Sequence, residues 1–193
     1  EGIGTAWSTN IPNYNPRDIV DNVKRLIKGE ETVDMTPWYK GFEGVTAMLD
    51  LNKWETRGII EEIDDTTLKI SELPVGCWTQ AFKEFLQKKI TSEEIVDFRE
   101  NHTDITVSFT ISVTEKQMQD AKEAGFYKFF KLNKKISTSN MTLFAPDGTI
   151  KTYSSTHEIL KEFFNVRQEY YVKRKEHTLA KLRRELDILD NKV

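Results

Sequence analysis

Apolar and polar residues alternate most strictly near the middle of the chain. Residues 105–113 read ITVSFTISV, in which every second side chain from Ile105 to Val113 is apolar. A period of two places the apolar side chains on one face of a strand and the hydroxyl side chains on the other. We therefore predict a strand over 105–113 with one core-facing side and one polar side, as in an antiparallel sheet.

Shorter alternating segments on either side predict two hairpins. Each pair of segments is joined by residues that favour turns, because Asp, Pro and Gly accept the backbone conformations that a reversal needs. The predicted hairpins are 54–60 with 68–70 about Asp64-Asp65, and 140–145 with 149–153 about the sequence Pro-Asp-Gly. With the strand at 105–113, they predict an α+β fold built on a mixed, largely antiparallel sheet with packed helices.

Apolar residues spaced three and four apart predict four helices before residue 126. Most of them begin at a recognisable capping residue, such as Asn15 before Pro16 or Thr114 with Gln117 three positions later. The predicted helices are 16–29, 78–89, 91–98 (on the pattern Thr91 with Glu94) and 114–125.

The last part of the chain predicts one long helix. Ser155 with Glu158 forms a capping-box pattern, and residues 155–193 contain neither Pro nor Gly, so the helix would be roughly 55 Å long. Its first half is rich in apolar and aromatic residues. Its second half carries an apolar series spaced 3, 4, 3 and 4, formed by Leu179, Leu182, Leu186, Leu189 and Val193. This seam favours one arm of a coiled coil, with a lone helix as the alternative.

Composition and charge narrow the class of protein only slightly. The chain has 193 residues, a net charge of −3 and a single cysteine, Cys77, which excludes an internal disulfide. No apolar run approaches the roughly 20 residues of a membrane span. The lysines at 128–135 and the basic residues at 167–184 form two local clusters. Taken alone, such clusters are more often solvated faces than nucleic-acid contacts.

A complete catalytic site is not recognisable in the sequence. The three histidines, His102, His157 and His177, are far apart, and no paired carboxylates, phosphate-binding glycine loop or nucleophile motif accompanies them. The pattern therefore favours a binding or scaffolding unit. Because the sequence begins with Glu1 and not Met, we expect it to be an internal piece of a longer chain.

One loop near the start presents an unusual apolar residue. Residues 9–16 read TNIPNYNP, in which Ile11 stands among turn-forming residues and directly before Pro12. Asn15-Pro16 then opens a helix, so the loop lies at a helix N-terminus, which favours negative charge. Without further information, such an isoleucine is more often packed into a local core than presented to a partner.

Several long motifs resemble eukaryotic DNA topoisomerase II, in the same order along essentially the whole chain. The first is EGIGTAWSTNIPNYNP at 1–16. The others are PWYKGF at 37–42, ISELPV at 70–75 with WTQ at 78–80, HTD at 102–104, GFYKFFKL at 125–132, ISTSNM at 136–141, EFF at 162–164, YY at 170–171 and KRK at 173–175.

The resemblance implies a DNA-binding role. Residues 1–15 would close a preceding winged-helix domain, 16–154 would form the tower region of the DNA-cleavage core, and 155–193 would begin the coiled coil. The family bends its DNA with an Ile-Pro wedge, which here corresponds to Ile11 and Pro12. The DNA-binding residues that we predict are Ile11, Pro12, Asn10, Lys40, Lys128, Lys131, Lys134 and Lys135.

The resemblance also implies what this chain lacks. The family cuts DNA with a tyrosine preceded by arginine, and no tyrosine here follows arginine. We therefore expect no catalytic or metal-binding residue in this chain, with Mg²⁺ and ATP belonging to the full enzyme. Expected partners are double-stranded DNA and, in the full enzyme, a second copy, although this fragment could be a monomer. The expected setting is the nucleus, in chromosome segregation.

Three departures from the family pattern keep an alternative open. Ala6 replaces a usual glycine, Gly76-Cys77 replaces a position that is often basic, and the segment before His102 is shorter. They are compatible with a non-catalytic, topoisomerase II-like chromosomal interaction or scaffold protein. An unrelated enzyme is disfavoured, because the sequence contains no recognisable catalytic constellation.

Overall fold

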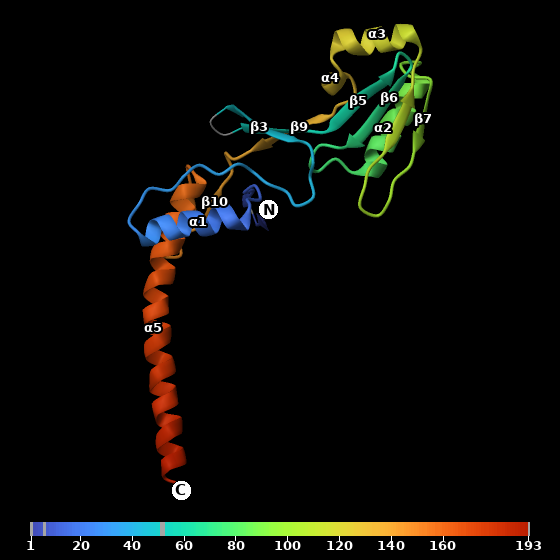
Figure 1. The fold of residues 1–193 in the computed structure, drawn as a ribbon. Helices are drawn as coiled ribbons and strands as arrows, with labels where there is room; N and C mark the ends of the chain where they lie inside the picture. Colours follow the sequence, from blue (N-terminus) through green and yellow to red (C-terminus); the bar gives the residue numbers. More distant parts are fainter. Residues whose placement is uncertain (1, 6, 51–52, 193) are drawn as a thin grey trace. The chain divides into compact units, whose positions relative to one another are not determined.

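The structure is a computed structural model that describes residues 2–5, 7–50 and 53–192. The chain forms two compact units (Figure 1). The helical unit comprises Glu1–Ile11, Pro16–Met35 and Asn140–Val193, and the sheet unit comprises Pro12–Asn15 and Thr36–Ser139. The domain ranges expected from the sequence, 1–15, 16–154 and 155–193, are each continuous, whereas both units combine separate segments. Those ranges therefore stay a prediction. Ala6, one departure from the family pattern, lies outside the described residues.

A four-stranded antiparallel sheet in the order β5-β6-β8-β7 forms the main core of the sheet unit. Its strands are β5 (Ile59–Asp64), β6 (Thr67–Glu72), β7 (Asp97–Glu100) and β8 (Phe109–Ser112). Leu68, Ile70, Phe109 and Ile111 are fully buried on one face, where the apolar side of α2 (Thr79–Thr91) covers them. The α+β class with largely antiparallel pairing is therefore confirmed.

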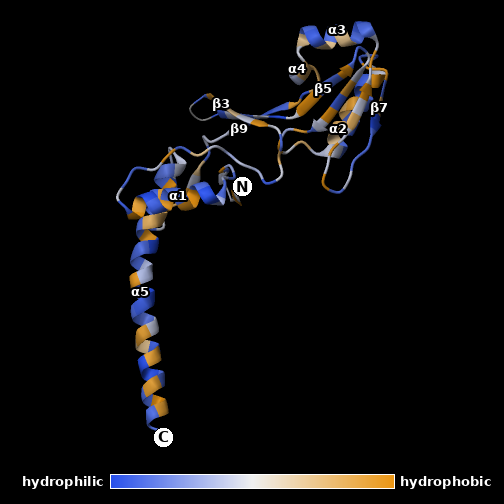
Figure 2. Cartoon of the chain, viewed as in Figure 1, coloured by the Kyte–Doolittle hydropathy of each residue, from blue (hydrophilic) through white to orange (hydrophobic). Residues whose placement is uncertain are grey.

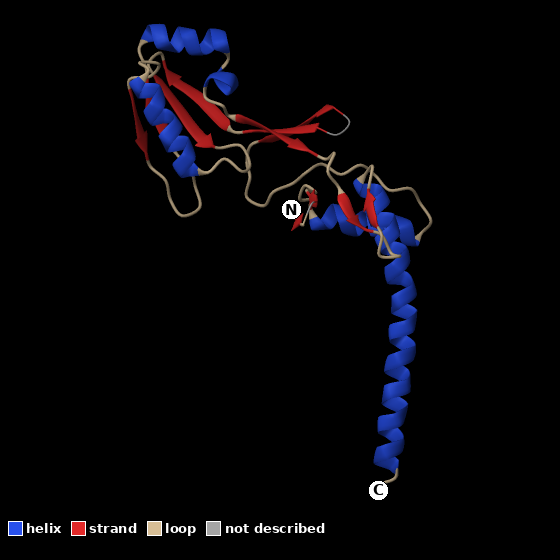
Figure 3. Ribbon diagram, turned by 180° about the vertical axis from the view of Figure 1, so that it is seen from behind, coloured by secondary structure: helices blue, strands red, loops and turns tan. Residues whose placement is uncertain are grey.

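A second sheet in the same unit has the order β3-β4-β9 (Figure 3). It comprises β3 (Val45–Asp50), β4 (Lys53–Arg57) and β9 (Asn133–Ser137). The predicted strand over 54–60 is wrong as one strand, because the chain passes from this sheet to the four-stranded sheet at Gly58. The Gly58 N–H donates to the Leu132 carbonyl (2.9 Å), and a Cβ at Gly58 would lie 2.2 Å from the Glu72 carbonyl oxygen.

Two local predictions in this unit are corrected. The helix predicted over 91–98 is absent from the described chain, since Thr91 belongs to the last turn of α2 and its hydroxyl donates back to Gln87 (3.1 Å). Glu93 then takes a left-handed conformation, with φ of 58°, that ends the helix. The strand predicted over 105–113 begins only at Phe109, because a turn at 103–106 holds Ile105 outward with 92% of it exposed.

The helix predicted over 114–125 is confirmed as α3 (Glu115–Ala124). Thr114 and Gln117 form the predicted capping box, and Gly125, with φ of 82°, ends the helix. The short helix α4 (Phe126–Phe129) follows, and α3 lies across one end of the four-stranded sheet (Figure 1).

The first and the last described residues of the chain both belong to the helical unit. It contains β1 (Gly2–Gly4), β2 (Trp7–Thr9), α1 (Pro16–Ile27), β10 (Thr142–Phe144), β11 (Ile150–Thr152) and α5 (Thr156–Asp190). The helix beginning at Pro16 and the β10–β11 hairpin are confirmed. Asp147 fixes the hairpin turn by accepting from the Thr149 N–H (3.0 Å) and hydroxyl (2.7 Å).

The long helix is also confirmed. Ser155 caps α5 by accepting from the Glu158 N–H (3.3 Å), although the Glu158 side chain bonds Ser154 and not the Ser155 backbone. Figure 2 shows apolar positions recurring along α5 to its end. The seam leucines at 179, 182, 186 and 189 are 43–58% exposed, and Val193 lies outside the described residues. The coiled coil stays a prediction.

Candidate nucleic-acid interface

The loop before Ile11 is fixed to the start of β10 within the helical unit. The Asn10 N–H donates to the Asn140 carbonyl (2.8 Å). The Thr9 hydroxyl donates to the same carbonyl (3.3 Å) and accepts from the Thr142 N–H (3.1 Å). These bonds join residues 130 or more positions apart and define the backbone that leads into Ile11.

The loop after Ile11 is fixed within the sheet unit. The Asn13 carbonyl accepts from the Trp38 N–H (2.8 Å), and Tyr14 forms an isolated β-bridge with Pro37. Pro12 is buried. The Ile11–Pro12 step is therefore flanked by backbone hydrogen bonds on both sides. Ile11 itself is partly buried, so its side chain is neither fully packed in a core nor fully exposed as the wedge role would imply.

Lys134 and Lys40 lie near one cleft of the sheet unit. Lys40, Gly76 and Cys77 are among the residues that line the cleft, and the Lys134 Nζ donates to the Gly76 carbonyl (2.7 Å). Burial raises the pKa of the Cys77 thiol, and the nearby Lys134 ammonium partly opposes this. One predicted lysine, Lys40, therefore lines the cleft, and a second, Lys134, is bonded to a residue of its lining.

Lys135 lies on the opposite face of β9, directly across from Glu55 on β4. Glu55 is buried and accepts from Arg57 Nε (2.5 Å) and Asn133 Nδ2 (3.0 Å). Burial alone would raise the pKa of the Glu55 carboxyl, but these hydrogen bonds outweigh burial and hold the pKa below its usual value. This face of the sheet therefore contains a fixed negative charge among three basic or amide side chains.

Lys128 and Lys131 lie in and just after α4. Lys131 takes a left-handed backbone conformation, with φ of 52°, and its Nζ lies 5.1 Å from the centre of the Phe85 ring. Lys89 contacts the same ring and is buried in an ion pair with Glu94 (2.5 Å). The predicted lysines therefore all belong to the sheet unit, but they occupy three separate places in it.

Arg57 and Lys89 were missed by the sequence analysis. Arg57 lies over the Tyr127 ring (5.9 Å) as well as against Glu55. The alternation Lys53, Glu55, Arg57 could have identified a charged strand face. No sequence pattern indicated that Lys89 would be buried, because a lysine near the end of a helix is normally solvated.

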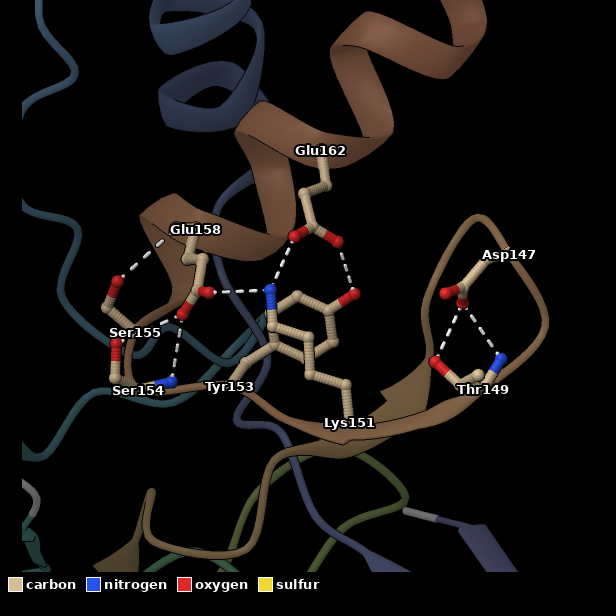
Figure 4. A network of polar contacts seen from close by, with 8 residues as sticks. All are labelled: Asp147, Thr149, Lys151, Tyr153, Ser154, Ser155, Glu158 and Glu162. Atoms are coloured by element: carbon tan, nitrogen blue, oxygen red, sulfur yellow. Dashed lines mark hydrogen bonds and ion pairs between the residues drawn. The ribbon is translucent and has the colours of Figure 1, made fainter.

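A polar network fixes α5 to the β10–β11 hairpin (Figure 4). The Lys151 Nζ lies 2.5 Å from Glu162 and 2.8 Å from Glu158, and the Tyr153 hydroxyl donates to the second Glu162 oxygen (2.5 Å). The hydrogen bonds from Lys151 are the main reason that the pKa values of both carboxyls are lowered. The base of α5 and the hairpin therefore form one bonded assembly.

Histidines and acidic residues do not form a metal site in the described part of the chain. His102 Nδ1 accepts from the Ser108 N–H (3.0 Å), and His157 Nε2 lies 2.8 Å from an Asp34 oxygen. Within residues 2–5, 7–50 and 53–192, no group of three or more His, Cys, Asp or Glu side chains could hold a metal ion. These residues thus offer no fit to the Mg²⁺ of the family.

None of the described helices is long and apolar enough to cross a membrane.

A sequence model of the DNA gyrase/topoisomerase IV A-subunit family matches residues 1–193. The chain belongs to this family. Among curated relatives, it is 43% identical over 197 residues to DNA topoisomerase 2 of Candida albicans and 45% identical over 200 residues to that of Pisum sativum. These alignments cover 100% of this chain but only 13% and 14% of the two relatives.

A solved structure from the family has the same fold. It is the DNA-binding, cleavage and re-ligation domain of Plasmodium falciparum topoisomerase II, which matches with a TM-score of 0.92 and 44% identity. The match covers 95% of this chain and 26% of that chain. The resemblance to eukaryotic DNA topoisomerase II inferred from the motifs is therefore confirmed. DNA binding by this chain, and the residues that would make the contacts, remain predictions.

Proposed function

We propose that this chain is a DNA-binding and DNA-bending segment of an ATP-dependent type II DNA topoisomerase. The observation that carries the proposal is the apolar Ile11–Pro12 step in a chain of this family, with Asn10 bonded within the helical unit and Asn13 bonded within the sheet unit. The solved relative of 44% identity is named as a DNA-binding, cleavage and re-ligation domain. The segment would act in double-strand passage without being catalytic by itself.

The wedge role has a clear physical basis. An apolar side chain inserted at a base step costs a few kcal/mol of unstacking, and the resulting bend brings more phosphate onto the protein. Pro12 fixes its own φ and restricts Ile11 to extended conformations, so the wedge loses little entropy on insertion. Because Ile11 is partly buried, its exposed part would enter the stack while the rest supports it.

The lysines would supply affinity that does not depend on sequence. Lys134 is bonded to Gly76, and Lys131 lies over Phe85. In the described part of the chain, Lys40, Lys128 and Lys135 are exposed and form no ion pair, although the Lys135 charge helps to lower the pKa of Glu55 across the strand pair. We therefore propose that Lys40, Lys128 and Lys135 make the main phosphate contacts, with Lys131 and Lys134 contributing less.

Salt dependence of duplex binding tests this part of the proposal. Affinity should fall steeply with salt, and the slope of log affinity against log salt should decrease by about 1 for each phosphate contact removed. The triple variant Lys40→Gln, Lys128→Gln, Lys135→Gln should lose the most slope. Lys161→Gln on α5 is the control and should keep it. An affinity that is flat with salt in the unaltered protein would overturn the phosphate role.

The scaffold alternative rests on the departures from the family pattern. The clearest described one is Gly76-Cys77, which stands at a position that is often basic and so removes one possible phosphate contact. Incubating the full-length protein with supercoiled DNA and Mg²⁺ and then denaturing it distinguishes the two functions. A covalent protein–DNA adduct supports the topoisomerase, and its absence supports the scaffold. With the topoisomerase we also propose a homodimer, dependence on Mg²⁺ and ATP, and a nuclear role in chromosome segregation.

A further inference from the structure

A single hydroxyl connects the loop before Ile11 to two points of another segment. Thr9 Oγ1 donates to the Asn140 carbonyl (3.3 Å) and accepts from the Thr142 N–H (3.1 Å). Both partners belong to the helical unit, as do Thr9 and Ile11. Thr9 precedes Ile11 by two residues. The side-chain hydrogen bonds of Thr9 therefore help to fix the position of the backbone that leads into Ile11.

The segment that Thr9 contacts is itself well supported. Met141, between the two partners of Thr9, is buried, and its carbonyl accepts from the Tyr153 N–H (2.9 Å). Tyr153 bonds Glu162 on α5 through its hydroxyl (2.5 Å). The Asn140 side chain also donates to the Ser8 hydroxyl (3.1 Å). Thr9 thus attaches the loop to residues that are fixed in turn to the base of the long helix.

We propose that Thr9 is a positioning residue for the Ile11 wedge. The inference rests on the proposed DNA-bending function and gives a role in it to Thr9, a motif residue to which the resemblance assigned none. The Thr9 hydroxyl sets the direction of the loop, and Ile11 makes the contact with the bases. With the Asn10 backbone hydrogen bond alone, the loop could still rotate about that one attachment. The two hydrogen bonds of Thr9 attach the loop at a second point, one residue earlier, and so restrict this rotation.

The chemistry of threonine offers a well-matched test. Valine has the same shape, so Thr9→Val removes both hydrogen bonds and keeps the methyl group that faces Gly2, where a Cβ would lie 3.1 Å from Thr9 Cγ2. Valine also suits a strand, which preserves β2. Thr9→Ser keeps the hydroxyl and loses the methyl group. The pair therefore separates hydrogen bonding from packing.

The experiment compares DNA bending across four variants of the full-length protein. Energy transfer between dyes at the two ends of a short duplex measures the ratio of bent to straight DNA at saturating protein. Thr9→Val should lower this ratio about threefold or more, since each of the two lost hydrogen bonds is worth roughly a factor of two to ten. Thr9→Ser should stay near the unaltered protein. Adding Thr9→Val to Ile11→Ala should produce no further loss.

Each contrary outcome has a distinct meaning. If Ile11→Ala reduces bending and Thr9→Val does not, the positioning role is wrong and the wedge stands. If the losses of Thr9→Val and Ile11→Ala add, Thr9 acts by another route and the inference fails. If Ile11→Ala leaves bending unchanged, the wedge function fails. Where Thr9→Val does not fold, Thr9→Ala replaces it, with the same expected loss of bending.

Discussion

The Nζ of Lys151 on β11 lies 2.5 Å from an oxygen of Glu162 on α5, and the same ammonium lies 2.8 Å from Glu158. One cation thus joins a short hairpin to two successive turns of the long helix. Isolated surface ion pairs contribute little to stability, but this one belongs to a network that includes Tyr153 and Ser154. The network explains how a two-stranded hairpin persists at the base of α5.

Replacing Lys151 should make the thermal stability of the protein depend less on pH in the acidic range. The pKa values of Glu158 and Glu162 are lowered in the folded chain, chiefly by hydrogen bonds from Lys151. Their contribution is therefore present above the unfolded-state pKa of about 4.3 and is lost as pH falls through the lowered values. Lys151→Met should lower the melting temperature at pH 7, and the difference from the unaltered protein should shrink below about pH 4.

The control for this prediction is Lys161→Met on the same helix, which is exposed and should leave the melting temperature nearly unchanged at both pH values. Thermal unfolding followed by circular dichroism measures all three proteins. Equal losses for Lys151→Met at neutral and strongly acidic pH would contradict the ionic origin of the effect.

Asn22 should be essential for the segment after α1. It is buried, its Nδ2 donates to the Val33 carbonyl (2.9 Å), and its Oδ1 accepts from the Val33 N–H (2.8 Å). Asn22→Ala leaves both backbone groups without their partner, which should cost about 1–3 kcal/mol in the free energy of unfolding. Denaturant titration measures the loss. Asp21→Ala, at an exposed neighbouring position, should change stability by about 0.5 kcal/mol or less, and similar losses for both would disprove the role of the Val33 bonds.

Gly76 should resist substitution for two separable reasons. Its φ is +76°, which costs any other residue about 1 kcal/mol, and a Cβ would lie 2.8 Å from Lys134 Nζ, so the flexible lysine would move and lose its bond to the Gly76 carbonyl. Gly41 has φ of +82° and nothing within 4 Å of its Cβ position, so Gly41→Ala reports the backbone cost alone. Gly76→Ala should be the more destabilising of the two in chemical denaturation. Adding Lys134→Ala should remove the excess, and an excess that persists would place the clash elsewhere.

The sequence predicts the start of a helix correctly where the residues that determine it are neighbours in the chain. Pro16 begins α1, and Thr114 with Gln117 begins α3, because caps and helical periodicity act within a few residues. The same reasoning failed at Thr91, whose capping pattern is real in the sequence. There the preceding helix continues to Thr91, so its hydroxyl bonds backward to Gln87.

Errors in the strands have a tertiary cause. Alternation continues across Gly58, but the close approach of the Glu72 carbonyl transfers the chain to another sheet at that point. Alternation also continues to Ile105, but a turn that includes Thr103 and Thr106 ends the pairing before it. A period of two reports which way side chains point and says nothing about which strand lies beside them.

The candidate site was predicted in part for the same reason. Turn chemistry singled out Ile11 and Pro12 from adjacent residues, and the family motifs supplied a role. The bonds that hold the loop join Thr9 to Asn140 and Thr142, more than 130 positions away. Such long-range partners depend on the assembled fold, and no local pattern indicates them.

The most direct test of the proposed function is DNA bending by Ile11→Ala in the full-length protein, measured by energy transfer across a doubly labelled duplex. Ile105→Ala, in which a 92% exposed isoleucine is removed from another loop, is the matched control. We predict that Ile11→Ala reduces bending strongly while changing the free energy of unfolding by about 1 kcal/mol or less, and that Ile105→Ala bends DNA normally. Normal bending by Ile11→Ala, or a large loss of its stability, would contradict the wedge and place Ile11 in the core.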